Sequence, residues 1–278
     1  MYKISAKKIV IGTELFSGSR EKKYSYSEIK YFFSKLISIG INHIDTAPSY
    51  GVNSSVEKVV GDCLKTKRKD FILSSKFLNK KFSNSNQRLD YLKKEFENTL
   101  KNLQTDYIDN YFFHSGENKD FFDDKVWTYL NDLKDKKYIF NLGLALKHDL
   151  VKKNSLLQLF KSKNYGISII STTLNMFSNE SVHKLIPYCK KNNLKIWGRM
   201  PLAKGLLSGK YKSINELNEK DDRYLKSKNI TKAIIDYSVK YNINSAKALK
   251  WASNHSDKMI IGFKNIKQLK EILSWWKI

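Results

Sequence analysis

Short runs of β-branched and aromatic residues alternate along the whole chain with longer segments whose apolar residues have helical spacing. The runs expected to be strands are residues 8–13, 43–45, 71–76, 107–114, 139–144, 167–171, 195–200 and 258–261. The expected helices are residues 26–39, 55–64, 87–103, 121–136, 150–160, 181–192, 231–241, 246–253 and 266–275. Strict alternation predicts a parallel sheet covered by helices. Eight strand-helix units favour an α/β fold closed into a (β/α)8 TIM barrel, although alternation alone also permits an open, doubly wound sheet.

The length of the chain agrees with one such barrel. It has 278 residues, and α/β barrels commonly form one domain of about 250 residues. We therefore expect residues 1–278 to be a single barrel domain. No apolar stretch is long enough for a membrane span, and the first residues lack the apolar run of a secretory signal. The only cysteines, Cys63 and Cys189, lie in apolar helical patterns. Together these features favour a reduced, cytoplasmic protein.

The formal net charge of +24 raises the question of a nucleic-acid or membrane partner. Only 5 of the basic residues are arginines, the residue type that binds phosphates and bases through two donors at once. The other 46 are lysines, which are spread along the chain. We interpret the charge as a solvated surface, and we expect neither a nucleic acid nor a membrane as partner.

Four chemically active side chains follow three neighbouring expected strands. Asp45, Lys76 and His114 stand at the strand ends, and Tyr50 lies in the loop after Asp45. In a barrel the active site lies at the carboxyl ends of the strands, so we expect these four side chains to meet. A phenol has an ordinary pKa of about 10, and an adjacent ammonium favours the phenolate and lowers that pKa. The set therefore predicts a proton donor for a carbonyl oxygen.

Each of these residues also has a purely structural interpretation. Asp45 can cap a turn, Tyr50 and Lys76 are common residue types in this chain, and His114 can be a core histidine. Their joint position at consecutive strand ends favours the chemical interpretation. The scattered histidines and two cysteines have no metal-ligand spacing, so we expect no metal.

Several segments carry a resemblance to a known family. Residues 40–51 (GINHIDTAPSYG) look like the signature of the aldo-keto reductases. Residues 72–77 (ILSSKF) and 106–114 (DYIDNYFFH) resemble the family's lysine and histidine strands. Residues 201–211 (PLAKGLLSGKY) resemble the loop that covers the cofactor phosphates, and residues 248–251 and 261–271 resemble the end of the barrel. The resemblance spans nearly the whole chain.

The resemblance implies a function and a set of roles. Tyr50 is expected to be the general acid, Lys76 and Asp45 its tuning pair, and His114 an orienting donor in the reduction of an aldehyde or ketone by NADPH. The substrate would be a small carbonyl compound. The residues that the resemblance assigns to the cofactor are Thr13, Asp45, Ser171, Pro201, Leu202, Lys210, Gly262, Lys264, Gln268 and Glu271. Lys264 is expected to pair with a 2′-phosphate, and a helix N-terminus offers free amides to an anion.

The chain departs from the family pattern around the reactive ring of the cofactor. Ala145 and Leu146 stand where Ser-Asn is usual, and Ser171 stands in place of a glutamine. Arg199 replaces an aromatic residue that often stacks on the nicotinamide, and Ile272 replaces an asparagine. These departures leave a second hypothesis open, in which the barrel binds a cofactor for a regulatory or non-redox role.

Overall fold

The computed structural model shows a closed barrel of eight parallel strands in chain order, β1 to β8, so the open-sheet alternative is wrong. The structure describes residues 5–17, 24–77, 80, 82–114, 116–146, 153–178, 180–218, 220–263, 267–268 and 270. The strands are β1 (Ile9–Gly12), β2 (His43–Asp45), β3 (Ile72–Phe77), β4 (Ile108–His114), β5 (Ile139–Ala145), β6 (Ile167–Thr173), β7 (Lys195–Arg199) and β8 (Lys258–Ile261). Pairing of Val10 with Ile260 brings β8 back to β1 and closes the ring.

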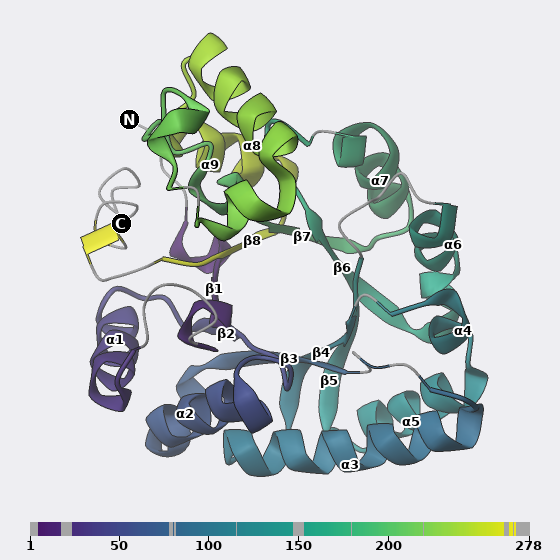
Figure 1. The fold of residues 1–278 in the computed structure, drawn as a ribbon. Helices are drawn as coiled ribbons and strands as arrows, with labels where there is room; N and C mark the ends of the chain where they lie inside the picture. Colours follow the sequence, from purple (N-terminus) through teal and green to yellow (C-terminus); the bar gives the residue numbers. More distant parts are fainter. Residues whose placement is uncertain are drawn as a thin grey trace.

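Helices surround the strands, as the view along the barrel axis in Figure 1 shows. They are α1 (Tyr26–Ser38), α2 (Ser55–Leu64), α3 (Ser85–Leu103), α4 (Asn118–Phe121), α5 (Asp124–Asp135), α6 (Lys153–Lys161), α7 (Glu180–Lys191), α8 (Asp222–Lys240) and α9 (Ser245–His255). A capping box between Ser25 and Glu28 starts α1, where the sequence placed it. Among the described helices, none is long and apolar enough to cross a membrane.

Apolar side chains form a core on each side of the strands, because successive residues of a strand point to opposite faces. The large outer layer lies between strands and helices and includes Leu142, Leu144 and Leu146 of the β5 segment. The inner layer fills the barrel itself. It consists of Val10, Phe112, Ala145, Ile169 and Trp197, with Ile260 against them. This filled interior leaves the chemistry to the rims of the barrel.

Two helices differ from the expectations. The segment 121–136 is broken, because Asp123 caps α5 by accepting a hydrogen bond from the Lys125 amide, and α4 ends before it. Helix α8 begins at Asp222, nine residues before the expected start, because Asp221 caps it there. From the sequence the start is expected later, where the helical spacing of apolar residues begins. The expected helix 266–275 falls almost entirely outside the described residues.

Candidate active site

The carboxyl ends of β2, β3 and β4 bring Asp45, Lys76 and His114 to one rim of the barrel. Parallel pairing sets this arrangement, since Asp45 lies beside Ser74 and Lys76 beside Phe112. The loop after β2 adds Tyr50, whose amide donates to the Ala47 carbonyl at 3.0 Å. The structure therefore brings together all four residues that the sequence selected as catalytic candidates.

The loop that carries Tyr50 depends on Gly51. Its φ of +75° is unfavourable for residues with a side chain, and a Cβ at this position would lie 2.1 Å from the Ser55 Oγ. The Ser54 hydroxyl donates to the Pro48 carbonyl at 3.0 Å and ties the loop to the start of α2. These contacts direct the loop back over the rim.

Lys76 is the centre of the site. Its Nζ donates to Asp45 Oδ2 at 2.8 Å and to the Thr46 carbonyl at 2.6 Å, and both charged side chains are 3% exposed. The same Nζ lies 4.8 Å from the centroid of the Tyr50 ring and is hydrogen-bonded to Tyr50. Burial lowers the pKa of Lys76, but Asp45 and Tyr50 together raise this pKa by more than burial lowers it. The net shift is therefore upward. Lys76 is therefore a charged ammonium held against the phenol.

Tyr50 keeps its proton in this environment. Burial raises the pKa of its phenol, and this effect outweighs the lowering by Lys76, so the net shift is upward. The sequence-based expectation of a lowered Tyr50 pKa was therefore wrong in its net direction, because it considered the ammonium and not the burial. The protonated phenol is the form that can donate.

His114 lies edge-on to Tyr50, with their ring centroids 6.4 Å apart. Burial, together with the charges of Lys76 and Arg199, holds the pKa of His114 well below its ordinary value of 6.5. A neutral imidazole carries one donor and one acceptor nitrogen. His114 is thus suited to orient an oxygen beside Tyr50 through a hydrogen bond rather than through a charge.

Arg199 is a further member of the site. In the sequence it is identifiable only as a departure from the family pattern and not as a site residue. It ends β7, and its guanidinium donates to the Leu146 carbonyl. Burial lowers its pKa, while the nearby Tyr50 and Asp45 raise it. The signal that could have identified it is a charged residue at the carboxyl end of a strand, directly after the buried residues Ile196, Trp197 and Gly198.

Two predicted cofactor residues lie at the same rim. Ser171, on β6, has a buried Oγ without a hydrogen-bond partner among the described residues, and Asp45 has such an atom in Oδ1. These atoms fit a ligand that brings amide or hydroxyl groups. Thr13 is fully buried, and its hydroxyl donates to the Asp45 carbonyl at 3.1 Å. Thr13 therefore holds the backbone of Asp45 in place.

The loop after β7 contains Pro201, Leu202 and Lys210. Pro201 is buried, Leu202 partly buried and Lys210 exposed. Its backbone is unusual, because five residues with positive φ lie in or next to it: Met200, Ala203, Lys204, Gly205 and Gly209. Such turns can point successive amides at an anion. Arg223 anchors the loop from α8, donating to the Lys204 carbonyl and to the Tyr211 hydroxyl, each at 3.0 Å.

The last predicted cofactor segment is only partly described. Gly262 and Gln268 are exposed, whereas Lys264 and Glu271 lie outside the described residues, as does Ile272. Within the described part of the chain, no three His, Cys, Asp or Glu side chains are placed to hold a metal ion.

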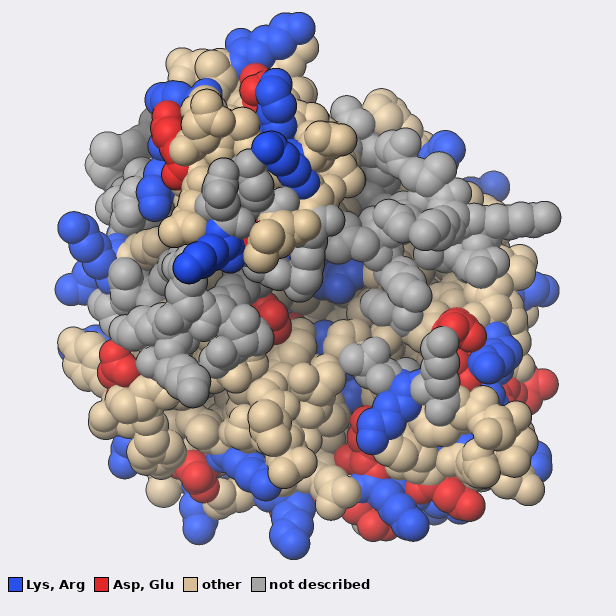
Figure 2. Space-filling model, viewed as in Figure 1, with Lys and Arg blue, Asp and Glu red and all other residues tan. Residues whose placement is uncertain are grey.

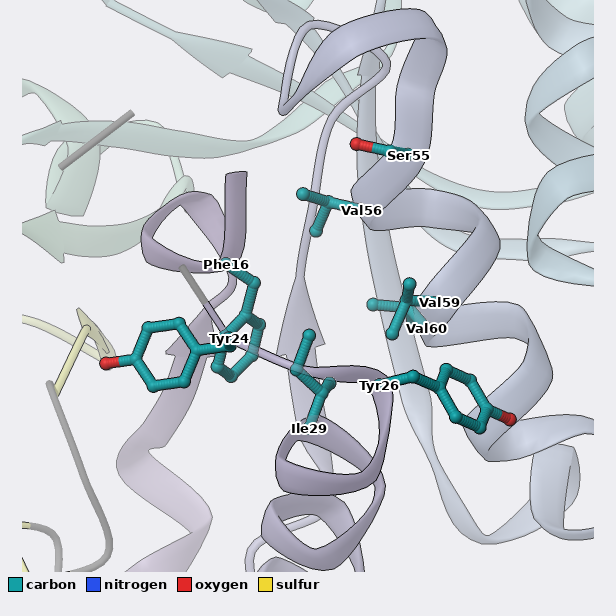
Figure 3. A pocket seen from close by; sticks show the side chains of 8 residues that line it. All are labelled: Phe16, Tyr24, Tyr26, Ile29, Ser55, Val56, Val59 and Val60. Carbon is teal, nitrogen blue, oxygen red and sulfur yellow. The ribbon is translucent and has the colours of Figure 1, made fainter. Parts of the chain in front are cut away.

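A groove of about 190 Å³ lies elsewhere, between α1, α2 and the turn Glu14–Ser17. Figure 3 shows its lining, in which apolar side chains are mixed with hydroxyl-bearing ones: Phe16, Tyr24, Tyr26, Ile29, Ser55, Val56, Val59 and Val60. None of the rim residues lines it, so it is separate from the candidate site.

Comparisons with known proteins agree with this geometry. A model of the aldo/keto reductase family matches residues 8–278. The uncharacterized oxidoreductase YqkF of Bacillus subtilis is 28% identical over 205 residues, which cover 72% of this chain and 63% of that protein. Aldo-keto reductase YhdN of the same bacterium is 30% identical over 219 residues, which cover 74% of this chain and 62% of that protein. The matches thus span less than two thirds of these relatives.

A solved structure supports the fold alone. The holo form of aldo-keto reductase AKR11C1 from Bacillus halodurans superposes with a TM-score of 0.70 at 22% identity, covering 98% of this chain and 87% of that one.

Proposed function

The chain belongs to the aldo/keto reductase family, and we propose that it is an oxidoreductase that reduces an aldehyde or a ketone to an alcohol. The finer parts of this proposal are NADPH as the cofactor and Tyr50 as the general acid. The observation that carries it is the position of the Lys76 ammonium, which is bonded to the Asp45 carboxylate and lies against the Tyr50 phenol.

The protein side of the reaction follows from this arrangement. A substrate carbonyl oxygen at the rim accepts a hydrogen bond from the Tyr50 hydroxyl, and His114 orients the same oxygen. As negative charge develops on that oxygen, Tyr50 gives up its proton, and Lys76 stabilises the resulting phenolate. Asp45 keeps Lys76 charged in spite of its burial. General acid catalysis of this kind contributes about 10² to 10⁴ in rate.

The residues at the rim fit a nicotinamide cofactor in part. When bound, it supplies the hydride for the carbonyl carbon. Asp45 Oδ1 would accept a hydrogen bond from one of its hydroxyl groups, and Ser171 Oγ would donate to or accept from its amide group. The loop with Pro201, Leu202 and Lys210 would hold its phosphates. Gly262, Lys264, Gln268 and Glu271 would hold the adenosine end.

Relatives are named for different cofactors. One is the NADH-specific methylglyoxal reductase of Escherichia coli, and another is the aldo-keto reductase yakc of Schizosaccharomyces pombe, whose name carries NADP(+). For this chain we propose NADPH, on the basis of Lys264 as the partner of a 2′-phosphate.

One observation favours a second candidate function, a cofactor-binding barrel with a regulatory or non-redox role. At the end of β5, Ala145 and Leu146 offer no polar side chain to a nicotinamide amide, and both are fully buried. The backbone N–H and C=O of Leu146 are engaged by Ser171 and Arg199.

The deciding experiment measures NADPH oxidation with a broad panel of aldehydes for the natural chain and for Tyr50→Phe. We expect the variant to fold and to bind NADPH, measured by fluorescence quenching, while its rate falls by about 10² to 10⁴. Undiminished turnover in Tyr50→Phe would remove Tyr50 from the mechanism. NADPH binding without turnover of any aldehyde would favour the second candidate.

We also propose that residues 1–278 form one domain and that the protein acts in the cytoplasm on small molecules. Both cysteines are free, and burial raises the pKa of Cys63 to about 11 and that of Cys189 to about 12, so neither thiol is activated as a nucleophile. Figure 2 shows Lys and Arg side chains dispersed over one face of the molecule rather than gathered in one patch, which supports the expectation of a solvated basic surface without a nucleic-acid partner.

A further inference from the structure

The loop between β2 and α2 is attached to β3 at both of its ends. At its start, the Thr46 amide donates to the Ser74 carbonyl at 2.8 Å. At its end lies the first turn of α2, where Glu57 Oε1 accepts a hydrogen bond from the Ser75 hydroxyl at 2.7 Å. The two serines are neighbours on β3, and the next residue of this strand is Lys76. Both attachments therefore lie directly before the ammonium of the candidate site.

Tyr50 is coupled to the second attachment through the first turn of α2. The Val56 amide donates to the Tyr50 carbonyl at 3.4 Å. Gly51 approaches the same turn so closely that a Cβ on it would lie 2.1 Å from the Ser55 Oγ. Glu57 belongs to this turn as well. A shift of the turn relative to β3 would therefore carry the backbone of Tyr50 with it.

The contact between Glu57 and Ser75 adds a direction that apolar packing lacks. Val56 and Val60 bury the same face of α2 in the core, but hydrophobic contacts have no preferred direction. A hydrogen bond does have a preferred geometry, and both partners of this one are fully buried. Lys76 lowers the pKa of Glu57 against the rise that burial causes, so the carboxyl lies within electrostatic reach of the ammonium.

We infer that Glu57 is a positioning residue for the proposed reduction: through Ser75 it holds the loop of Tyr50 where the phenol rests against Lys76. This inference rests on the proposed reductase function. In this role Glu57 contacts neither the substrate nor the cofactor. Its loss leaves the catalytic side chains in place chemically but moves the phenol relative to the ammonium. A small displacement of this kind slows the chemical step more than it weakens binding.

The test measures kcat and KM with NADPH and the aldehyde that the natural chain reduces fastest. We expect Glu57→Ala to lower kcat by about 10- to 100-fold with little change in KM. Ser75→Ala should act in the same way, and the double variant should be no slower than either single one, because both changes remove one hydrogen bond. Glu57→Gln keeps an acceptor oxygen and should recover most of the lost kcat.

Val60→Ala is the matched control. It removes fully buried apolar packing from the next turn of α2 and leaves the contact with β3 intact. It should therefore lower the melting temperature without lowering kcat, when all variants are assayed well below their melting temperatures. Equal losses of kcat in Val60→Ala and Glu57→Ala would overturn the inference, because any loosening of α2 would then be enough. Unchanged kcat in Glu57→Ala would also overturn it and leave the reductase function standing.

Two further outcomes are separable from these. If Glu57→Ala does not fold, Ser75→Ala decides by the same criteria. If the natural chain reduces no aldehyde, the proposed function fails, and hydrogen exchange decides whether the contact holds the loop. Glu57→Ala and Ser75→Ala should then speed the exchange of backbone amides in residues 46–56, and Val60→Ala should leave residues 46–54 unchanged. Unchanged exchange in the first two variants would reject the positioning role.

Discussion

The Nζ of Lys76 lies 2.8 Å from Oδ2 of Asp45, and the same ammonium lies against the ring of Tyr50. Because of this placement, Asp45 has two effects that an experiment can separate. The Asp45 carboxylate compensates the buried charge of Lys76, which affects the stability of the fold. Asp45 also keeps Lys76 protonated beside the Tyr50 phenol, which affects the rate of reduction.

We predict that Lys76→Met lowers kcat/KM by about 10² to 10⁴ and destabilises the fold by about 3–5 kcal/mol, because it leaves the Asp45 charge buried and unpaired. In Lys76→Met/Asp45→Asn neither charge remains, so much of the stability should return while the rate stays low. Denaturant unfolding and aldehyde turnover, measured on the same samples, check both effects. Recovery of the rate along with the stability would show that the ammonium acts only on the fold.

A second prediction concerns the cofactor. NADPH should bind more tightly than NADH, and Lys264→Glu should weaken NADPH binding by roughly 1–3 kcal/mol through loss of a charge-assisted contact with the 2′-phosphate. Fluorescence titrations with both cofactors measure this difference. If Lys264→Glu weakens the two cofactors equally, Lys264 does not contact the 2′-phosphate.

The catalytic candidates could be predicted from sequence because strand ends are local signals. Asp45, Lys76 and His114 each close a short apolar run, and parallel pairing then puts such ends on one rim. The break between α4 and α5 could not be predicted in this way. There Arg88 of α3 binds Asp120 and Asp123 in a buried cluster, and this contact joins residues more than thirty positions apart.

The sequence pattern also could not predict which way each side chain at the rim points. Ala145 and Leu146 are neighbours, yet Ala145 belongs to the core inside the barrel and Leu146 to the core outside it. Only the observed end of β5 shows which of the two faces the site. Likewise, the pKa of Tyr50 depends on its burial, which is a property of the assembled loop.

These directions lead to a third prediction, about restoring the family's usual residues at the nicotinamide pocket. Ala145→Ser and Ser171→Gln place polar groups inside the barrel, and together they should tighten NADPH binding if the ring lies there. Leu146→Asn instead buries an amide in the outer core and should destabilise the fold by about 1–3 kcal/mol. Thermal melts and NADPH titrations of the double and triple variants separate these effects. A triple variant as stable as the double one would contradict the assignment of Leu146 to the outer core.

The last prediction concerns a buried acid behind the site. Glu57 of α2 is fully buried, and its Oε1 accepts a hydrogen bond from the Ser75 hydroxyl at 2.7 Å. Burial raises its pKa from the ordinary 4.5 to about 7; Glu95 adds to the increase, while Ser75, Asn102 and Lys76 oppose it. The folded chain therefore binds this proton more tightly than the unfolded chain does.

A raised pKa in the folded state means that the contribution of Glu57 to stability is fully present below about pH 4.5 and is lost as the pH rises through about 7. The loss amounts to about 3 kcal/mol above pH 7. Glu57→Gln keeps an oxygen for Ser75 and does not ionise, so it should match the natural chain near pH 5 and be more stable by up to about 3 kcal/mol at pH 8. Urea unfolding of both proteins at several pH values between these limits measures the difference.

Ser75→Ala in the Glu57→Gln background controls for the hydrogen bond, because it should lower stability equally at every pH. Parallel pH profiles for the natural chain and Glu57→Gln would mean that Glu57 is already ionised in the folded chain at pH 5, and that its buried carboxylate is compensated by its neighbours.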